Sequence, residues 1–268
     1  MHKIISASII YMLLPIFFCH AQSNWESLNM IKTLDVKAKL IATDKLGNLY
    51  TVNDQEIIKF DANGQMLQKN SIKSLGNISS IDVSNPLKIL AFFRDYNKVI
   101  FLDNMLATTP NGIDLSSIAF DQATLVCTSH DNGIWLYNIL NFEIVRMDPS
   151  LKITHQSGNI AQLTGNAIKP MAMFETNNRV YICDTIQGVL IFDVFGTYIK
   201  TIPIKSIRDL QVENNTLYFI DETGFGSFDL DLIRQTEIAL PEKNIQQIRL
   251  QKNRVFMRLT DRVVIYGY

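Results

Sequence analysis

The sequence lacks the surplus of positive charge that nucleic-acid binding requires. Its 268 residues include 25 lysines and arginines against 26 acidic residues, so the formal net charge is -1. A protein that neutralises the phosphates of a nucleic acid needs an excess of basic side chains. The composition therefore argues against general nucleic-acid binding.

The side chains that usually supply nucleophiles and metal ligands are also scarce. Beyond residue 21 the chain holds two histidines, His130 and His155, and two cysteines, Cys127 and Cys183. It contains no HExxH, GxSxG, P-loop or CxxC motif, each of which would indicate a particular chemistry. His130 precedes Asp131 in a turn pattern, where we expect an exposed side chain. The sequence thus predicts no catalytic residue, no metal site and no cofactor, in a protein that is not an enzyme.

The two cysteines leave open whether a disulfide forms. Both lie in apolar strand patterns, Cys127 in Leu-Val-Cys-Thr and Cys183 in Val-Tyr-Ile-Cys. An export compartment would allow such a pair to oxidise. Because the two residues belong to different repeats, we favour two buried free thiols that pack as small apolar side chains.

Long apolar runs are absent beyond the start of the chain. A lysine followed by the apolar run 4–18 has the order and length of a signal peptide, and small residues at Cys19 and Ala21 predict cleavage after Ala21. The run is shorter than the roughly 20 residues of a spanning helix. A lipoprotein signal at Cys19 is the weaker alternative, because a phenylalanine stands where a small residue is needed. The sequence predicts a signal peptide over 1–21 and one exported domain over 22–268.

What the sequence does contain is a repeat. An aspartate closes an apolar strand pattern five times, at spacings of 42, 45, 45 and 36 residues. These aspartates are Asp61, Asp103, Asp148, Asp193 and Asp229. A period of about 40 residues with short strands between turns is typical of a β-propeller. Because an aspartate at a strand end can accept a hydrogen bond from the backbone two residues on, we expect these side chains to start turns.

Each repeat has the pattern of four short strands. Segments rich in β-branched and aromatic residues alternate with Asn-Gly and Asp-x-x-Gly turns, as tight hairpins require. The sixth repeat stops after its third strand, and the strand pattern at 28–36 can supply the missing outer strand. The sequence therefore predicts an all-β, six-bladed β-propeller with four antiparallel strands per blade, closed by an N-terminal strand. The longest loop is expected over 157–169.

The stretch that departs most from the repeat begins with Asn85, Pro86 and Leu87 and runs on to Arg94 and Tyr96. Proline confines that point to a strand start or a turn. Arginine and aromatic residues are enriched in protein interfaces. These five residues are our candidate protein-interaction site. The alternative is that Arg94 and Tyr96 only cover a rim of the fold.

An enzymatic alternative would place acidic ligands in the central channel. Asp44, Asp82, Glu175 and Glu213 are the candidates, because a calcium-dependent lactonase or phosphotriesterase would use such carboxylates. They form no recognisable constellation in the sequence, and acidic residues at strand ends are common in solvated turns. A calcium-dependent, lactonase-like hydrolase is therefore the less favoured alternative.

Two stretches carry a family resemblance: Asp-Val-Ser-Asn-Pro-Leu-Lys-Ile-Leu at 82–90 and Val-Ile-Phe-Leu-Asp at 99–103. With the six repeats and the export signal, the chain resembles small periplasmic propellers of bacteria that use type IX secretion, most of all the plug subunit. The resemblance implies a protein that closes the periplasmic mouth of a large outer-membrane β-barrel translocon protein, its partner. It transfers no functional residue. The alternative is a periplasmic ligand-binding propeller for a glycan or a peptide, which clustered aromatic residues around the channel mouth would favour.

Overall fold

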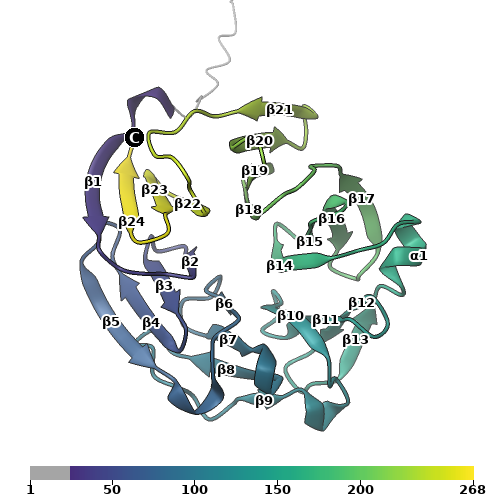
Figure 1. Cartoon of the computed structure of the whole chain (residues 1–268). Coiled ribbons are helices and arrows are strands. Elements are labelled where there is room, and N and C mark those ends of the chain that lie inside the picture. Colours follow the sequence, from purple (N-terminus) through teal and green to yellow (C-terminus); the bar gives the residue numbers. More distant parts are fainter. Residues whose placement is uncertain (1–24) are drawn as a thin grey trace, which may run out of the picture.

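The computed structural model describes residues 25–268, which form a closed ring of six sheets (Figure 1). Each sheet holds four antiparallel strands that follow one another outwards from a central channel. The fold is therefore the six-bladed β-propeller that the sequence predicts. The expected signal peptide over 1–21 lies outside the described residues. Within them, no helix is long and apolar enough to cross a membrane.

The first three blades each use four strands that are consecutive in sequence. Blade 1 consists of β2 (Leu40–Thr43), β3 (Leu49–Asn53), β4 (Glu56–Phe60) and β5 (Met66–Ser71). Blade 2 consists of β6 (Ser80–Asp82), β7 (Ile89–Phe93), β8 (Lys98–Leu102) and β9 (Ile113–Asp114). Blade 3 consists of β10 (Ala123–Thr128), β11 (Ile134–Asn138), β12 (Glu143–Met147) and β13 (Ile153–Gln156).

Blades 4 and 5 repeat this order, and blade 6 departs from it. Blade 4 consists of β14 (Pro170–Thr176), β15 (Arg179–Asp184), β16 (Gly188–Asp193) and β17 (Tyr198–Ile202). Blade 5 consists of β18 (Asp209–Glu213), β19 (Thr216–Ile220), β20 (Phe225–Asp229) and β21 (Arg234–Glu237). Blade 6 consists of β22 (Gln247–Gln251), β23 (Arg254–Arg258), β24 (Val263–Gly267) and β1 (Asn29–Leu34). The helical segments are η1 (Trp25–Ser27), η2 (Lys73–Leu75), η3 (Arg94–Tyr96), η4 (Ser116–Ile118) and α1 (Ile160–Thr164).

A strand from the other end of the chain completes blade 6. β1 lies antiparallel to β24, with Thr33 opposite Val264 and Leu34 opposite Val263. This pairing covers the outer edge of β24, which would otherwise expose a row of unpaired backbone groups. The closure predicted for 28–36 is confirmed, with the strand itself at Asn29–Leu34.

Successive strands of a blade run in opposite directions, so the turns between them lie alternately on the two faces of the disc. We call AB face the one that carries the turns between the first and second strands. We call BC face the one that carries the turns between the second and third strands. In blade 2 the AB turn is 83–88, whereas the BC turn contains η3, so β7 separates the two.

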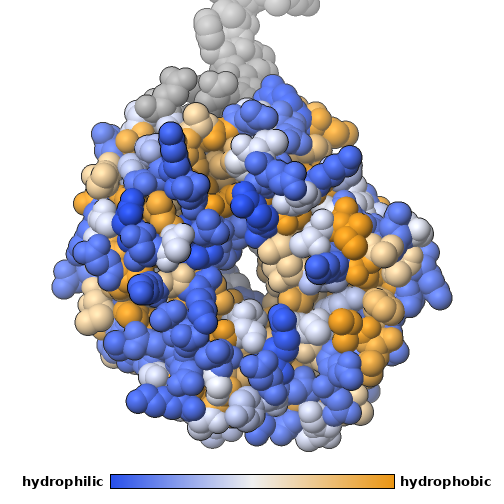
Figure 2. All heavy atoms as spheres, in the orientation of Figure 1, coloured by the Kyte–Doolittle hydropathy of each residue, from blue (hydrophilic) through white to orange (hydrophobic). Residues whose placement is uncertain are grey.

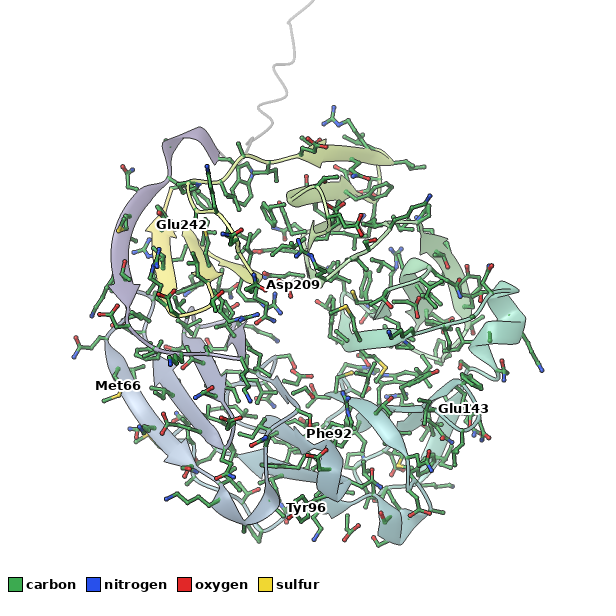
Figure 3. The ribbon with its side chains drawn as sticks, in the orientation of Figure 1. Met66, Phe92, Tyr96, Glu143, Asp209 and Glu242 are labelled. Carbon is green, nitrogen blue, oxygen red and sulfur yellow. The ribbon has the colours of Figure 1, made fainter. Side chains whose placement is uncertain are left out.

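Apolar side chains fill the space between every pair of neighbouring blades. Phe92 and Phe101 of blade 2 pack in one cluster with Val126 and Leu136 of blade 3. Five further clusters occupy the other five blade interfaces. Figure 3 accordingly shows Phe92 within the disc and Met66 at its outer edge. Because both sides of each sheet are covered, most residues of the middle strands are apolar on both sides of the sheet.

The recurring aspartates start turns, as predicted. Asp61, Asp103, Asp148 and Asp193 each accept hydrogen bonds through Oδ1 from the N–H groups two and four residues on. Asp229 accepts from the second and third N–H groups that follow it. The carboxylates therefore replace backbone partners in the turn from the third to the fourth strand.

Two of these turns also attach their blade to the one before it. Lys32 of β1 donates to the carbonyl of Gly64 at 3.0 Å, and Asn70 of β5 donates to the carbonyl of Leu106 at 2.5 Å. In both cases an outer strand binds the aspartate turn of the following blade. In blades 1 and 2 the aspartate turn therefore also joins neighbouring blades.

The sequence predicts a loop over 157–169. The structure shows that this region also contains α1. Asn159 caps this helix by accepting a hydrogen bond from the N–H of Gln162 at 3.0 Å. The amide of Gln187 donates to Thr164 at 3.0 Å, which fixes the helix on the BC turn of blade 4. Glycines at both ends conceal this one-turn helix in the sequence.

Candidate functional site

A polar pocket of about 600 Å³ opens on the AB face, between blades 2, 3 and 4. It brings together Asn85, Pro86 and Glu175, which the sequence analysis singles out for different reasons. Its lining also includes Lys45, Ser84, Lys88, Thr128, Ser129, His130, Asn132, Thr176, Asn177 and Asn178. Hydroxyl, amide and charged groups dominate this lining, and it contains no Phe, Tyr or Trp.

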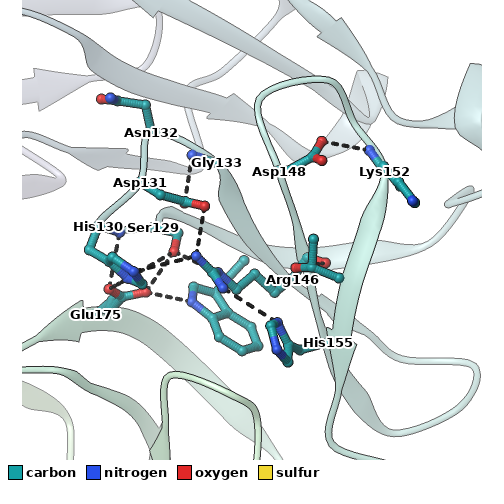
Figure 4. Close-up of polar contacts among 12 residues, drawn as sticks. Ser129, His130, Asp131, Asn132, Gly133, Arg146, Asp148, Lys152, His155 and Glu175 are labelled. Carbon is teal, nitrogen blue, oxygen red and sulfur yellow. Dashed lines mark hydrogen bonds and ion pairs between the residues drawn. The ribbon is translucent and has the colours of Figure 1, made fainter.

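Glu175 holds the floor of the pocket together. Its side chain is only 5% exposed. The carboxylate accepts hydrogen bonds from Trp135 Nε1 at 2.6 Å and from the Ser129 hydroxyl at 2.9 Å. It also accepts from the backbone N–H of His130 at 3.0 Å, and it lies 2.7 Å from the Nδ1 atom of that residue. Figure 4 shows these donors converging on one carboxylate, which therefore fastens blade 3 to blade 4.

Arg146 extends this network behind the β10–β11 turn. Its Nε donates to the Ser129 hydroxyl at 3.0 Å, and its Nη2 lies 2.7 Å from the Asp131 carboxylate. Burial acts to raise the pKa of Asp131, but hydrogen bonds from the turn backbone and from Arg146 hold it below its usual value. Arg146 Nη1 lies 3.4 Å from His155 Nδ1. The turn is thus held on both sides, by a carboxylate and by a guanidinium.

The geometry limits what His130 can do as a base. The side chain is exposed in the β10–β11 turn, as predicted. In the neutral tautomer that donates from Nδ1 to Glu175, the Nε2 atom is the acceptor. Arg146 Nη2 lies 3.5 Å from Nε2, so the free lone pair of His130 faces a guanidinium donor.

The five candidate interaction residues divide between the two faces. Asn85 and Pro86 line the pocket, and the Asn85 side chain accepts from the N–H of Leu87 at 3.1 Å. Leu87 projects from this turn with 70% of its surface exposed. Arg94 and Tyr96 belong to η3 at the other end of β7, on the BC face. The structure therefore does not bring the five residues together into one surface.

The other acidic candidates serve separate structural purposes. Asp44 accepts from the Tyr50 hydroxyl at 2.8 Å in its own blade, and Asp82 accepts from the backbone and hydroxyl of Thr128 at 2.8 and 2.7 Å. Burial raises the pKa of Glu213. Over residues 25–268, no group of three or more His, Cys, Asp or Glu side chains could hold a metal ion. The four acidic candidates therefore do not gather into such a group in this part of the chain.

Cys127 and Cys183 are both buried and unpaired. They belong to β10 and β15, in different blades. Burial raises the pKa of both thiols. The interpretation as two buried free thiols is confirmed.

Comparison with known proteins identifies the fold alone. No protein-family model and no curated protein matches the sequence. Among solved structures, the chain is similar to the WD40 domain of Pan2 from Neurospora crassa, with a TM-score of 0.63 and 10% identity over 86% of this chain and 89% of that one. It is similar to virginiamycin B lyase from Staphylococcus aureus, with a TM-score of 0.58 and 12% identity over 85% and 79% of the two chains. It is also similar to BamB from Moraxella catarrhalis, with a TM-score of 0.55 and 10% identity over 90% and 98%.

At such low identity these similarities show the propeller fold alone. None of the three proteins is a type IX plug, so that resemblance rests on the sequence stretches at 82–90 and 99–103.

Proposed function

We propose that this protein is a non-enzymatic, periplasmic interaction propeller that docks through its AB face. More specifically, we propose that the protein is the plug on the periplasmic side of a type IX outer-membrane translocon. The observation that carries the proposal is the Asn85–Pro86–Leu87 turn, which presents an exposed leucine beside the polar pocket. Proline and the Asn85 side-chain hydrogen bond restrict this turn, so little conformational entropy is lost when a partner covers Leu87.

The turn is also supported from the neighbouring blade. Lys88 donates to the carbonyl of Asn132 at 3.1 Å, and its ammonium lies 4.3 Å from the ring centre of Phe101. An apolar anchor held on a rigid turn and bordered by polar groups is the arrangement in which single residues dominate binding energy. This supports a protein partner at the AB face.

The closed ring supports the gate in particular. In each blade of the described ring, the third strand pairs with a fourth strand on its outer side. Apolar clusters join neighbouring blades. Only the outermost strand of each blade keeps an open edge, so such a disc can cover a pore while it offers few strand edges to another chain.

The network around His130 supports a role other than catalysis. A general base needs a free lone pair near its substrate. Here Nδ1 is engaged with Glu175, and Nε2 faces Arg146. The Ser129 hydroxyl, the nearest nucleophile type, donates to Glu175 rather than to the imidazole acceptor.

A peptide-binding propeller is the second candidate function, and the pocket favours it over a glycan receptor. Asn177 and Asn178 form a two-residue turn with positive φ angles of 51° and 56°, which presents both amides at the pocket rim. Amides and the ammonium of Lys45 suit backbone carbonyls and carboxylates. A glycan site would also be expected to offer aromatic faces, and the lining has no Phe, Tyr or Trp.

The test is a mild-detergent pull-down of the tagged 22–268 chain from its native membranes, followed by mass spectrometry. We expect a large outer-membrane β-barrel protein in fixed proportion. Leu87→Asp should reduce its recovery about tenfold or more, because a buried anchor would be replaced by a charge. The matched control is Leu163→Asp, which changes a leucine of 50% exposure on α1. Recovery of the chain alone, or equal losses in both variants, would exclude docking of the barrel through the AB face.

A further inference from the structure

The lining of the central channel contains more basic than acidic side chains, and some of its basic groups have donors without a hydrogen-bond partner in the described part of the chain. The channel encloses about 540 Å³, a volume typical of small-molecule sites. Its lining contains the basic residues Lys39, Lys45, Arg94, Arg208 and Arg249 and the acidic residues Asp82, Glu175 and Asp209. The chain as a whole has a net charge of -1, so a local excess of positive charge is specific to this place.

The carboxylates in the lining are already engaged in joining blades. Asp82 binds Thr128 of blade 3, and Glu175 binds the network described above. Asp209 of blade 5 accepts from the backbone N–H of Ile248 at 2.9 Å and from Arg249 Nη1 at 3.0 and 2.8 Å. Their lone pairs are directed at neighbouring blades, so they offer little to a cation in the channel.

Among the basic side chains, Lys39 forms an ion pair with Asp54, whereas the three arginines keep free donors. The guanidinium of Arg94 has no hydrogen bond or ion pair within the described part of the chain. All hydrogen bonds of Arg249 pass through Nη1, so its Nε and Nη2 have no partner in residues 25–268. Arg208 uses Nη2 alone, for the carbonyl of Asp221 at 2.5 Å. Arginine donors of this kind suit carboxylate and phosphate groups.

A fourth arginine lies close to this end of the channel. Arg258 donates from Nη1 to the carbonyl of Ala38 at 3.2 Å, whereas its Nε is buried without a partner. Burial lowers the pKa of Arg258, and the nearby Arg249 lowers it further, against the opposite effect of Asp209. Of the two guanidinium groups, only that of Arg249 is hydrogen-bonded to Asp209.

The opposite side of the channel is apolar. Met171 and Ala172 of β14 line it, together with Phe174. Figure 2 shows the opening bordered by blue hydrophilic side chains on one side and by pale orange ones on the other. A ligand that satisfies both borders has a charged head and a short apolar body.

We infer that the BC-face end of the channel binds a small organic anion, with its carboxylate or phosphate head at Arg208 and Arg249, which belong to the neighbouring blades 5 and 6. The apolar body lies along Met171 and Phe174. This site lies at the other end of the channel from the proposed docking face. The inference can therefore be tested independently of the plug proposal.

Calorimetric titration of the 22–268 chain with hexanoate and with hexyl phosphate tests the inference, with hexan-1-ol as the neutral probe. The three probes carry apolar chains of about five or six carbons, so they differ mainly in the head group. We expect anion binding that weakens as salt rises from about 50 to about 500 mM, since ions screen the attraction. Arg208→Gln should weaken binding about tenfold, which is typical of losing a charged hydrogen bond.

The matched control is Arg234→Gln, on the outer strand β21. It should change the affinity less than about twofold, because its guanidinium is remote from the channel. Tighter binding of hexanoate would identify a carboxylate ligand such as a peptide terminus. Tighter binding of hexyl phosphate would identify a phosphate ester. The inference is wrong if neither anion binds better than hexan-1-ol, or if Arg234→Gln weakens binding as much as Arg208→Gln.

Discussion

Removal of the Glu175 carboxylate should destabilise the ring more than any other change to the polar pocket. In Glu175→Ala, the indole N–H of Trp135 loses its acceptor, and this side chain is 0% exposed, so water cannot replace it. An unsatisfied buried donor costs about 1–3 kcal/mol. Ser129 keeps its bond to Arg146, and the exposed His130 can turn to water, so these donors add little. With about 1 kcal/mol for the cavity left behind, the expected loss of unfolding free energy is about 2–4 kcal/mol.

The measurement is urea unfolding of the 22–268 chain, followed by circular dichroism. A loss of this size corresponds to a fall in Tm of about 4–16 °C for a domain of this length. His130→Ala is the control for the exposed part of the network and should cost less than about 1 kcal/mol.

A double-mutant cycle identifies the cause. In a Trp135→Phe background the buried donor is already gone, so Glu175→Ala should cost at least about 1 kcal/mol less than in the parent chain. An equal cost of Glu175→Ala in both backgrounds would refute the reasoning, because the loss would then not depend on the indole hydrogen bond. A cost no greater than that of His130→Ala would refute it as well.

Three further predictions concern the backbone and the thiols. Gly188→Ala should cost more than about 2 kcal/mol, because φ is +102° and a Cβ would lie 2.3 Å from a backbone oxygen of the next strand; Gly158→Ala, with open space around it, should cost about 1 kcal/mol, and equal Tm values for the two would contradict this. Cys127 and Cys183 should react with a thiol reagent only after unfolding, and stability should fall as pH rises above about 8.5, where the unfolded thiols ionise and the folded ones, with raised pKa, do not; rapid labelling of the native chain would overturn this. Thr33→Pro should remove β1 from the ring and shift the urea midpoint by at least as much as Gly188→Ala, whereas an unchanged midpoint would mean that β1 does not stabilise the fold.

The fold could be predicted from the sequence because the patterns that indicate it lie within single hairpins. The aspartate that ends a third strand binds its own turn, so the repeat could be read without knowing any distant contact. The missing fourth strand of the last repeat likewise pointed to 28–36. Both inferences depend on residues within one hairpin or on counting strands, and both agree with the structure.

The candidate site depended on contacts that a sequence pattern does not contain. Glu175 meets Trp135, 40 residues away, only because blades 3 and 4 lie side by side. The five candidate interaction residues do not form one surface, because residues that are close in sequence can lie on opposite faces of the disc. Asn85 and Arg94 are close in sequence, yet the five residues of β7 carry the chain about 16 Å from one face to the other.

The pairing of β1 with β24 has a consequence for the time order of folding. The strand that is synthesised first among the described elements finds its partner only when the last one has emerged. Contacts between such distant segments form slowly, because the entropy of closing the largest loop must be overcome. During that interval β1 is an unpaired strand, and a chaperone or a membrane translocation step that delays folding would act on this segment before any other.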